Sequence, residues 1–89
     1  MAELIALGTT DTASADFTLA SGVSTTLHLK TADGVIPKGA YAAVEIKGGT
    51  GYTGIGSLRG LDPVQVLAAP GTYRVRRLAS TVAFGVERD

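Results

Sequence analysis

The amino-acid sequence predicts an all-β fold, a small antiparallel β-sandwich or barrel of jelly-roll or immunoglobulin-like type. Apolar side chains recur at every second position through most of the chain, which is the period of a half-buried strand. Gly, Pro, Asp and Ser break this alternation at intervals of roughly eight to twelve residues. No stretch combines a helical period with helix caps. We therefore expect about seven or eight short strands, with residues 1–89 forming a single β domain.

The first expected strand, residues 4–7, is apolar on both faces, unlike the alternating strands that follow it. Such a strand is either central in its sheet or covered by a neighbouring subunit. We take Leu4, Ile5 and Leu7 as candidate residues of a subunit interface. Residues 8–15 are rich in Thr, Ser and Asp, which predicts a loop.

The next two apolar segments predict a β-hairpin. Phe17 and Leu19 share one face, residues 20–22 supply turn chemistry, and an alternating strand returns over residues 25–30. In that second strand His28 lies on the outer face.

Residues 41–47 predict another half-buried strand, and the glycine-rich residues 48–51 link it to a strand over residues 52–58. Ile55 and Leu58 are out of step in the alternation. A β-bulge at Gly56 would restore the parity.

The last third of the chain predicts three more strands. A turn over residues 59–63 precedes a short strand that contains Val64, Val66 and Ala68, and Pro70-Gly71 makes the next reversal. Residues 71–76 follow as the clearest alternating strand, with Tyr73 and Val75 on one face. Residues 82–86 complete the set.

The length and composition predict self-association. A domain of 89 residues buries only roughly 60 to 65% of its unfolded surface, which leaves a small stability margin. Small domains are usually stabilised by disulfides or by a structural metal, but the chain has no cysteine and a single histidine. Oligomerisation is the remaining common route to stability, so we expect a homo-oligomer.

Charge and hydropathy exclude two kinds of partner. Eight basic residues balance eight acidic ones, and this neutrality removes the general attraction that nucleic acid requires. No apolar run reaches the roughly 18 residues of a membrane span, and no secretory leader is indicated, so we expect a product made in the cytoplasm.

The residues that usually carry catalysis or bind metal are sparse. His28 has no cysteine or second histidine to join it, so we expect a surface or interface histidine and neither a metal nor a cofactor site. Residues 48–51 lack the Lys-Ser/Thr of a phosphate loop, which favours a hairpin turn. We expect no enzymatic activity.

One basic cluster and three tyrosines are candidate contact residues. Arg74, Arg76 and Arg77 form either a solvated strand face or a contact to an acidic partner. Tyr41, Tyr52 and Tyr73 suit sheet packing or sugar binding. We take the three arginines and Tyr41 as the candidate partner contact.

Several segments together resemble a known class of proteins. They are the apolar start at residues 4–8, Asp16-Phe17-Thr18-Leu19, Ser24-Thr25-Thr26-Leu27, Val44-Glu45-Ile46-Lys47, Pro70-Gly71-Thr72-Tyr73-Arg74-Val75-Arg76-Arg77 and Phe84-Gly85-Val86-Glu87-Arg88. Across nearly the full chain this pattern resembles the short all-β structural proteins of tailed-bacteriophage morphogenesis regions. A similar Pro-Gly-Thr-Tyr start also occurs in bacterial immunoglobulin-like modules.

The resemblance implies that the chain is a virion component. It assigns no catalytic residue to this chain, because the family has no catalytic motif to match. The leading expectation is a capsid decoration or cement protein on the capsid surface, which clamps neighbouring copies of the major capsid protein noncovalently. A homotrimer would suit the local three-fold positions of an icosahedral capsid. The alternative is a small tail or fibre module, whose exposed tyrosines would bind host glycan.

Overall fold

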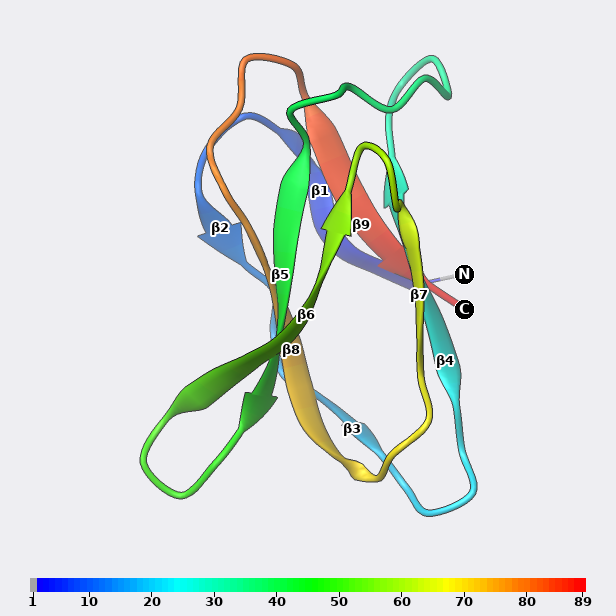
Figure 1. Ribbon diagram of the computed structural model, residues 1–89, viewed down its shortest axis with the longest axis vertical. Coiled ribbons are helices and arrows are strands. Elements are labelled where there is room, and N and C mark those ends of the chain that lie inside the picture. Colours follow the sequence, from blue (N-terminus) through cyan, green and yellow to red (C-terminus); the bar gives the residue numbers. More distant parts are fainter. Residues whose placement is uncertain (1) are drawn as a thin grey trace.

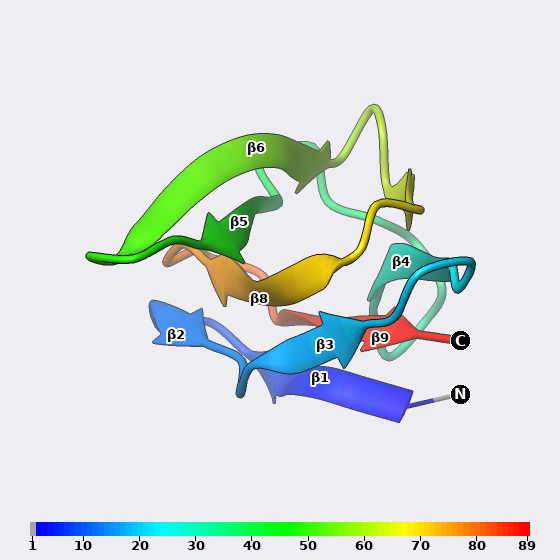
Figure 2. The ribbon, with the colours of Figure 1, turned by 90° about the horizontal axis from the view of Figure 1, so that it is seen from below.

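Two antiparallel sheets pack face to face in the computed structural model, which describes residues 2–89 (Figures 1 and 2). The first sheet has the order β1 (Ala2–Gly8), β9 (Phe84–Arg88), β4 (Thr25–Lys30) and β7 (Val64–Leu67). The second has the order β2 (Thr12–Ala13), β8 (Gly71–Arg77), β5 (Tyr41–Lys47) and β6 (Tyr52–Arg59), and β3 (Phe17–Leu19) also pairs with β8. The expected all-β sandwich is confirmed, with nine strands and no helix among the described residues.

The core lies between the sheets and comes from the alternation seen in the sequence. Each strand turns every second side chain inward, so both sheets contribute apolar groups to one layer. The largest fully buried side chains are Leu27, Val44, Leu58, Tyr73, Val75, Phe84 and Val86. None of the described residues belongs to a helix long and apolar enough to cross a bilayer.

The predicted hairpin between residues 17–19 and 25–30 is wrong. Phe17 of β3 pairs with Tyr73 of β8 in the second sheet, whereas β4 pairs with β7 and β9 in the first. Residues 20–24 carry the chain from one sheet to the other. Both strands still direct alternate apolar side chains into the core, but from opposite sides, and alternation alone does not reveal the pairing partner.

The predicted β5–β6 hairpin is confirmed, and its bulge lies one residue before the predicted position at Gly56. The backbone N–H of Gly48 donates to the carbonyl of Gly51, which has the positive φ of 155° that favours glycine. Val44 pairs with Gly56 and the next residue of β5 pairs with Gly54, so Ile55 is the extra residue. The hairpin tip projects from the body in both ribbon views (Figures 1 and 2).

The N-terminal strand β1 is an edge strand, which rules out the first of the two alternatives, a central position in the sheet. It pairs only with β9, and the register shifts on both sides of Ile5. These irregularities turn Ile5 into the core, where it is 3% exposed, and leave Leu4 half-buried against the same core. Of the three candidate interface residues, only Leu7 is largely exposed, at 44%. Ile5 is therefore not available to a second subunit.

Candidate interaction surfaces

Arg74, Arg76 and Tyr41 lie on the outer face of the second sheet. Arg74 of β8 is opposite Glu45 of β5, and Tyr52 of β6 lies on the same side of the sheet. We call this surface the arginine face and define it by Tyr41, Glu45, Tyr52, Arg74 and Arg76. The structure thus brings three of the four predicted contact residues together.

Arg74 is held by two neighbours on the arginine face. Its Nε donates to Glu45 Oε1 at 2.7 Å, and its guanidinium carbon lies 3.6 Å from the centre of the Tyr52 ring. The Tyr52 hydroxyl in turn donates to Asp16 Oδ1 at 2.7 Å, and this hydrogen bond raises the pKa of Tyr52. The guanidinium group of Arg74 is therefore already oriented before any partner binds.

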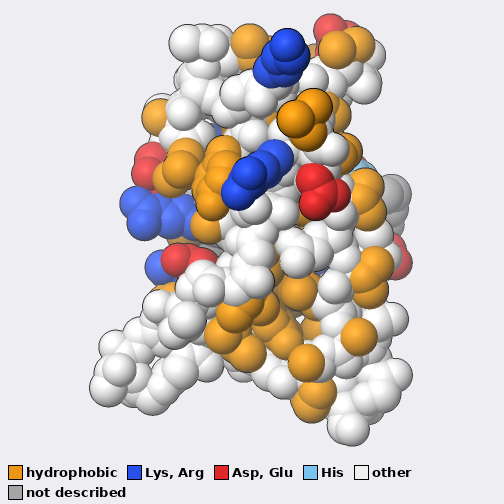
Figure 3. All heavy atoms as spheres, viewed as in Figure 1, with side chains coloured by type: hydrophobic (Ala, Val, Ile, Leu, Met, Phe, Trp, Pro, Cys, Tyr) orange, Lys and Arg blue, Asp and Glu red, His pale blue; other side chains and the backbone are white. Residues whose placement is uncertain are grey.

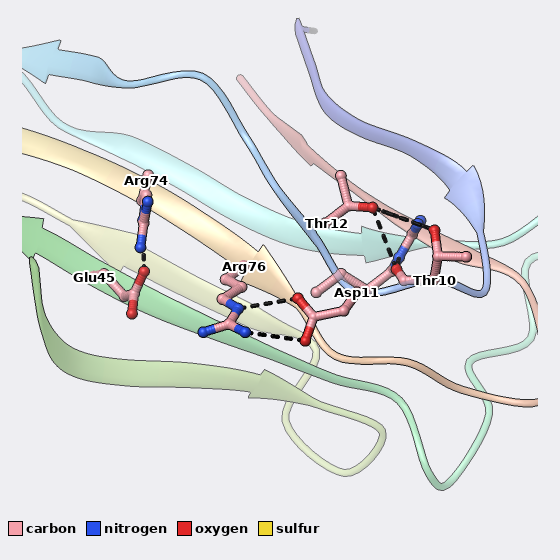
Figure 4. A network of polar contacts seen from close by, with 7 residues as sticks. Thr10, Asp11, Thr12, Glu45, Arg74 and Arg76 are labelled. Atoms are coloured by element: carbon pink, nitrogen blue, oxygen red, sulfur yellow. Dashed lines mark hydrogen bonds and ion pairs between the residues drawn. The ribbon is translucent and has the colours of Figure 1, made fainter.

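Arg76 is held in a bidentate pair with Asp11, which precedes β2. Its Nε and Nη2 atoms donate to the two carboxylate oxygens at 3.0 and 3.1 Å (Figure 4). The hydrogen bond from Arg76 lowers the pKa of Asp11, and the same bond raises the pKa of Arg76. Both side chains remain about half exposed, so the pair is accessible at the surface.

Arg77 is not a surface residue, and its prediction as a partner contact is wrong. It is 3% exposed and faces the space between the sheets. Its guanidinium donates to the carbonyls of Ala6 at 2.7 Å, Phe84 at 2.8 Å and Thr10 at 2.8 Å. The signal was present in the sequence, because the two-residue period that buries Tyr73 and Val75 also turns Arg77 inward.

The three tyrosines do not converge. Tyr73 is buried and its hydroxyl donates to the carbonyl of Ala69 at 2.7 Å. Tyr41 and Tyr52 share the outer face, but each lies under a guanidinium, from Arg59 at 5.5 Å for Tyr41.

His28 lies on the outer face of the first sheet, as expected. Its Nε2 is 3.8 Å from Glu87 Oε1, and Lys30 bonds to Glu3 and lies 3.7 Å from Glu87. The hydrogen bond to Glu3 raises the pKa of Lys30. Within residues 2–89 no group of three or more potential metal ligands comes together, and no pocket is found.

A second surface was not anticipated from the sequence. Val64 and Val66 point outward from β7 and are 51% and 60% exposed, and the neighbouring Leu61 is 89% exposed. Figure 3 shows hydrophobic side chains exposed along the margin where Figure 1 places β7. Pairing with β4 fixes this orientation, because Gln65 lies opposite Leu27 and Leu67 opposite Thr25, and both of these β4 side chains are buried. Gln65 and Leu67 therefore point toward the core and the two valines point away from it.

Comparisons with family models, with curated protein sequences and with solved structures found no match to this chain.

Proposed function

We propose that this chain is a structural protein of a tailed-bacteriophage virion, a decoration or cement protein that binds the outside of the capsid. The proposal is supported by the resemblance of its strand pattern to such proteins and by the arginine face. It assigns the chain no reaction and no cofactor. Its partner would be the major capsid protein, bound noncovalently.

The observation that carries the proposal is the preorganisation of the arginine face. Arginine and tyrosine are the residue types most enriched at protein interfaces and at their energetic centres. Binding is weakened when long side chains must be ordered, at about 0.5–1.5 kcal/mol per side chain. Because Glu45 and Tyr52 hold Arg74 while Asp11 holds Arg76, much of this ordering precedes binding.

The same pairing indicates the chemistry of the partner surface. The fork of Arg76 remains half exposed, and Asp11 lies beside it with similar exposure. A surface that offers both a carboxylate and a hydrogen-bond donor would match this pair. Several such contacts made by one oligomer on a repeating shell would add through avidity.

Co-sedimentation with purified empty capsids of the phage that encodes the chain tests the proposal. The unaltered chain should pellet with the shells, and the double variant Arg74→Ser, Arg76→Ser should bind about tenfold more weakly or worse. Lys38→Ser serves as the control, because Lys38 is an exposed cation in the β4–β5 connection. Equal binding by the double variant would remove the arginine face from the contact.

The alternative function, a tail or fibre module that binds host glycan, would use Tyr41 and Tyr52 on the same face. Sugar stacking needs an open aromatic ring, but Arg74 covers the ring of Tyr52 at 3.6 Å. Binding to purified tails, together with no binding to shells, would favour this alternative.

A further inference from the structure

We propose that two copies of the chain join their β7 strands edge to edge around a two-fold axis. Their two four-stranded sheets would then form one continuous sheet of eight strands. This inference concerns self-association and stands apart from capsid binding. It places a dimer where the resemblance to capsid proteins suggested a trimer.

The first support is the contrast among the four edges of the two sheets. β1 has register shifts on both sides of Ile5, and β6 has a bulge at Ile55. The remaining edge of the second sheet is divided between the short strands β2 and β3. Bulges and interruptions are the devices that keep edges from pairing with another chain. β7 has neither, because its register with β4 is regular from Val64 to Leu67.

The second support is the direction of the β7 backbone groups. The bond from the Leu29 N–H to the Pro63 carbonyl, at 3.0 Å, identifies a hydrogen-bonded pair. Such pairs alternate along antiparallel strands, so Gln65 and Leu67 bond to β4. The N–H and C=O groups of Val64 and Val66 therefore face the open edge, and no partner for them occurs within residues 2–89. β7 has only β4 as a neighbour in its sheet.

The third support is that the edge is apolar and suits a copy of itself. No charged residue occurs between Asp62 and Arg74 in the sequence, so like charges do not oppose the contact. Natural edges that stay unpaired usually carry lysine or another charge. The two valines are more than half exposed, and pairing would remove apolar surface from water.

An antiparallel copy fits this edge in a defined register. With the two-fold axis at Gln65, Val64 of one copy is opposite Val66 of the other. Both residues present outward backbone groups, so the two symmetric pairs would make about four N–H···O bonds. The valine side chains form a cross-strand cluster on the outer face.

The mass of the purified chain in solution, measured by light scattering over a concentration series, tests the proposal. We expect twice the 9.0 kDa of the single chain, and we expect Val66→Lys to return the mass to that of one chain. Val35→Lys is the matched control, because Val35 is also an exposed valine but lies in the β4–β5 connection. This variant should remain a dimer.

Amide hydrogen exchange on the unaltered chain gives a second readout that needs no variant. The N–H groups of Val64 and Val66 should be protected at high concentration and should lose protection on dilution. A single-chain mass at every concentration, a threefold mass, or a dimer that survives Val66→Lys would each overturn the proposal. A partner strand from another protein would leave the purified chain monomeric. Because no capsid is present, a failure here is separate from a failure of capsid binding.

Discussion

At the scale of single residues, Arg77 shows how one side chain joins segments that are distant in the sequence. Its guanidinium forms no ion pair with a carboxylate of residues 2–89, and its N–H groups instead donate to backbone carbonyls of β1, the β1–β2 loop and β9. Buried charges are tolerated only when they are fully hydrogen-bonded, and this planar fork meets that condition. Arg77 therefore positions the N-terminal and C-terminal strands against β8.

We expect Arg77→Met to destabilise the fold by about 3 kcal/mol, because it leaves buried carbonyls without donors. Urea unfolding monitored by circular dichroism measures this change. Arg76→Met is the matched control on the neighbouring position, and it should destabilise the fold far less, because exposed ion pairs contribute little. Equal losses for the two variants would contradict the role assigned to Arg77.

At the scale of elements, the sequence predicted orientation better than pairing. The alternation correctly placed Tyr73 and Val75 inward, and the parity change near Gly56 correctly located a bulge. The predicted hairpin over residues 17–30 was wrong. β3 and β4 have the sequence pattern of a hairpin, but they belong to different sheets. Strand partners depend on contacts between distant residues, which local periodicity does not contain.

The same contrast between side-chain orientation and strand pairing explains which candidate surfaces the sequence predicted. Arg74, Arg76 and Tyr41 were correctly placed together because an outward face follows from a two-residue period. The apolar edge at Val64 and Val66 was missed, because alternation alone suggests that the valines face the core. Their outward orientation depends on the register between β7 and β4, which only the folded chain supplies.

Packing between β1 and β9 allows a test at this scale. A Cβ added at Gly85 would lie 2.4 Å from the backbone oxygen of Ile5, so the two strands would have to separate. We expect Gly85→Ala to destabilise the protein by about 1–3 kcal/mol in thermal or urea unfolding. Gly54→Ala is the control, since a Cβ there meets nothing within 4 Å. It should be neutral or slightly stabilising, and an equally neutral Gly85→Ala would contradict the described packing.

At the scale of the molecule, three carboxylates accept hydrogen bonds that hold surface loops and the C-terminus in place. The pKa of Asp11 is lowered by the hydrogen bond from Arg76, that of Asp33 by the backbone N–H of Val35, and that of Asp89 by the backbone N–H of Thr26. A carboxyl whose pKa is lower in the folded state contributes stability above its unfolded pKa. That contribution is lost as the pH falls through the folded value.

We therefore expect the melting temperature to hold between about pH 5 and 7 and to fall below about pH 4. Thermal unfolding across this range measures the effect. The triple variant Asp11→Asn, Asp33→Asn, Asp89→Asn should be less stable near neutral pH and less sensitive to acid. An unchanged acid response in this variant would show that other groups govern it.

The two proposals together describe a molecule with separate surfaces for self-association and for docking. The β7 edge belongs to the first sheet, and the arginine face belongs to the second. Pairing through β7 would therefore leave two arginine faces free in each dimer. Two docking faces on one particle suit a protein that clamps neighbouring subunits of a shell.

The binding isotherm of the labelled chain on purified empty capsids of the phage proposed to encode it tests the central claim most directly. We expect binding that saturates at a fixed number of copies per capsid subunit and that weakens when Arg74 and Arg76 are replaced by serine. A chain that stays in the supernatant at every concentration, or that binds without saturating, would contradict the assignment as a capsid decoration protein.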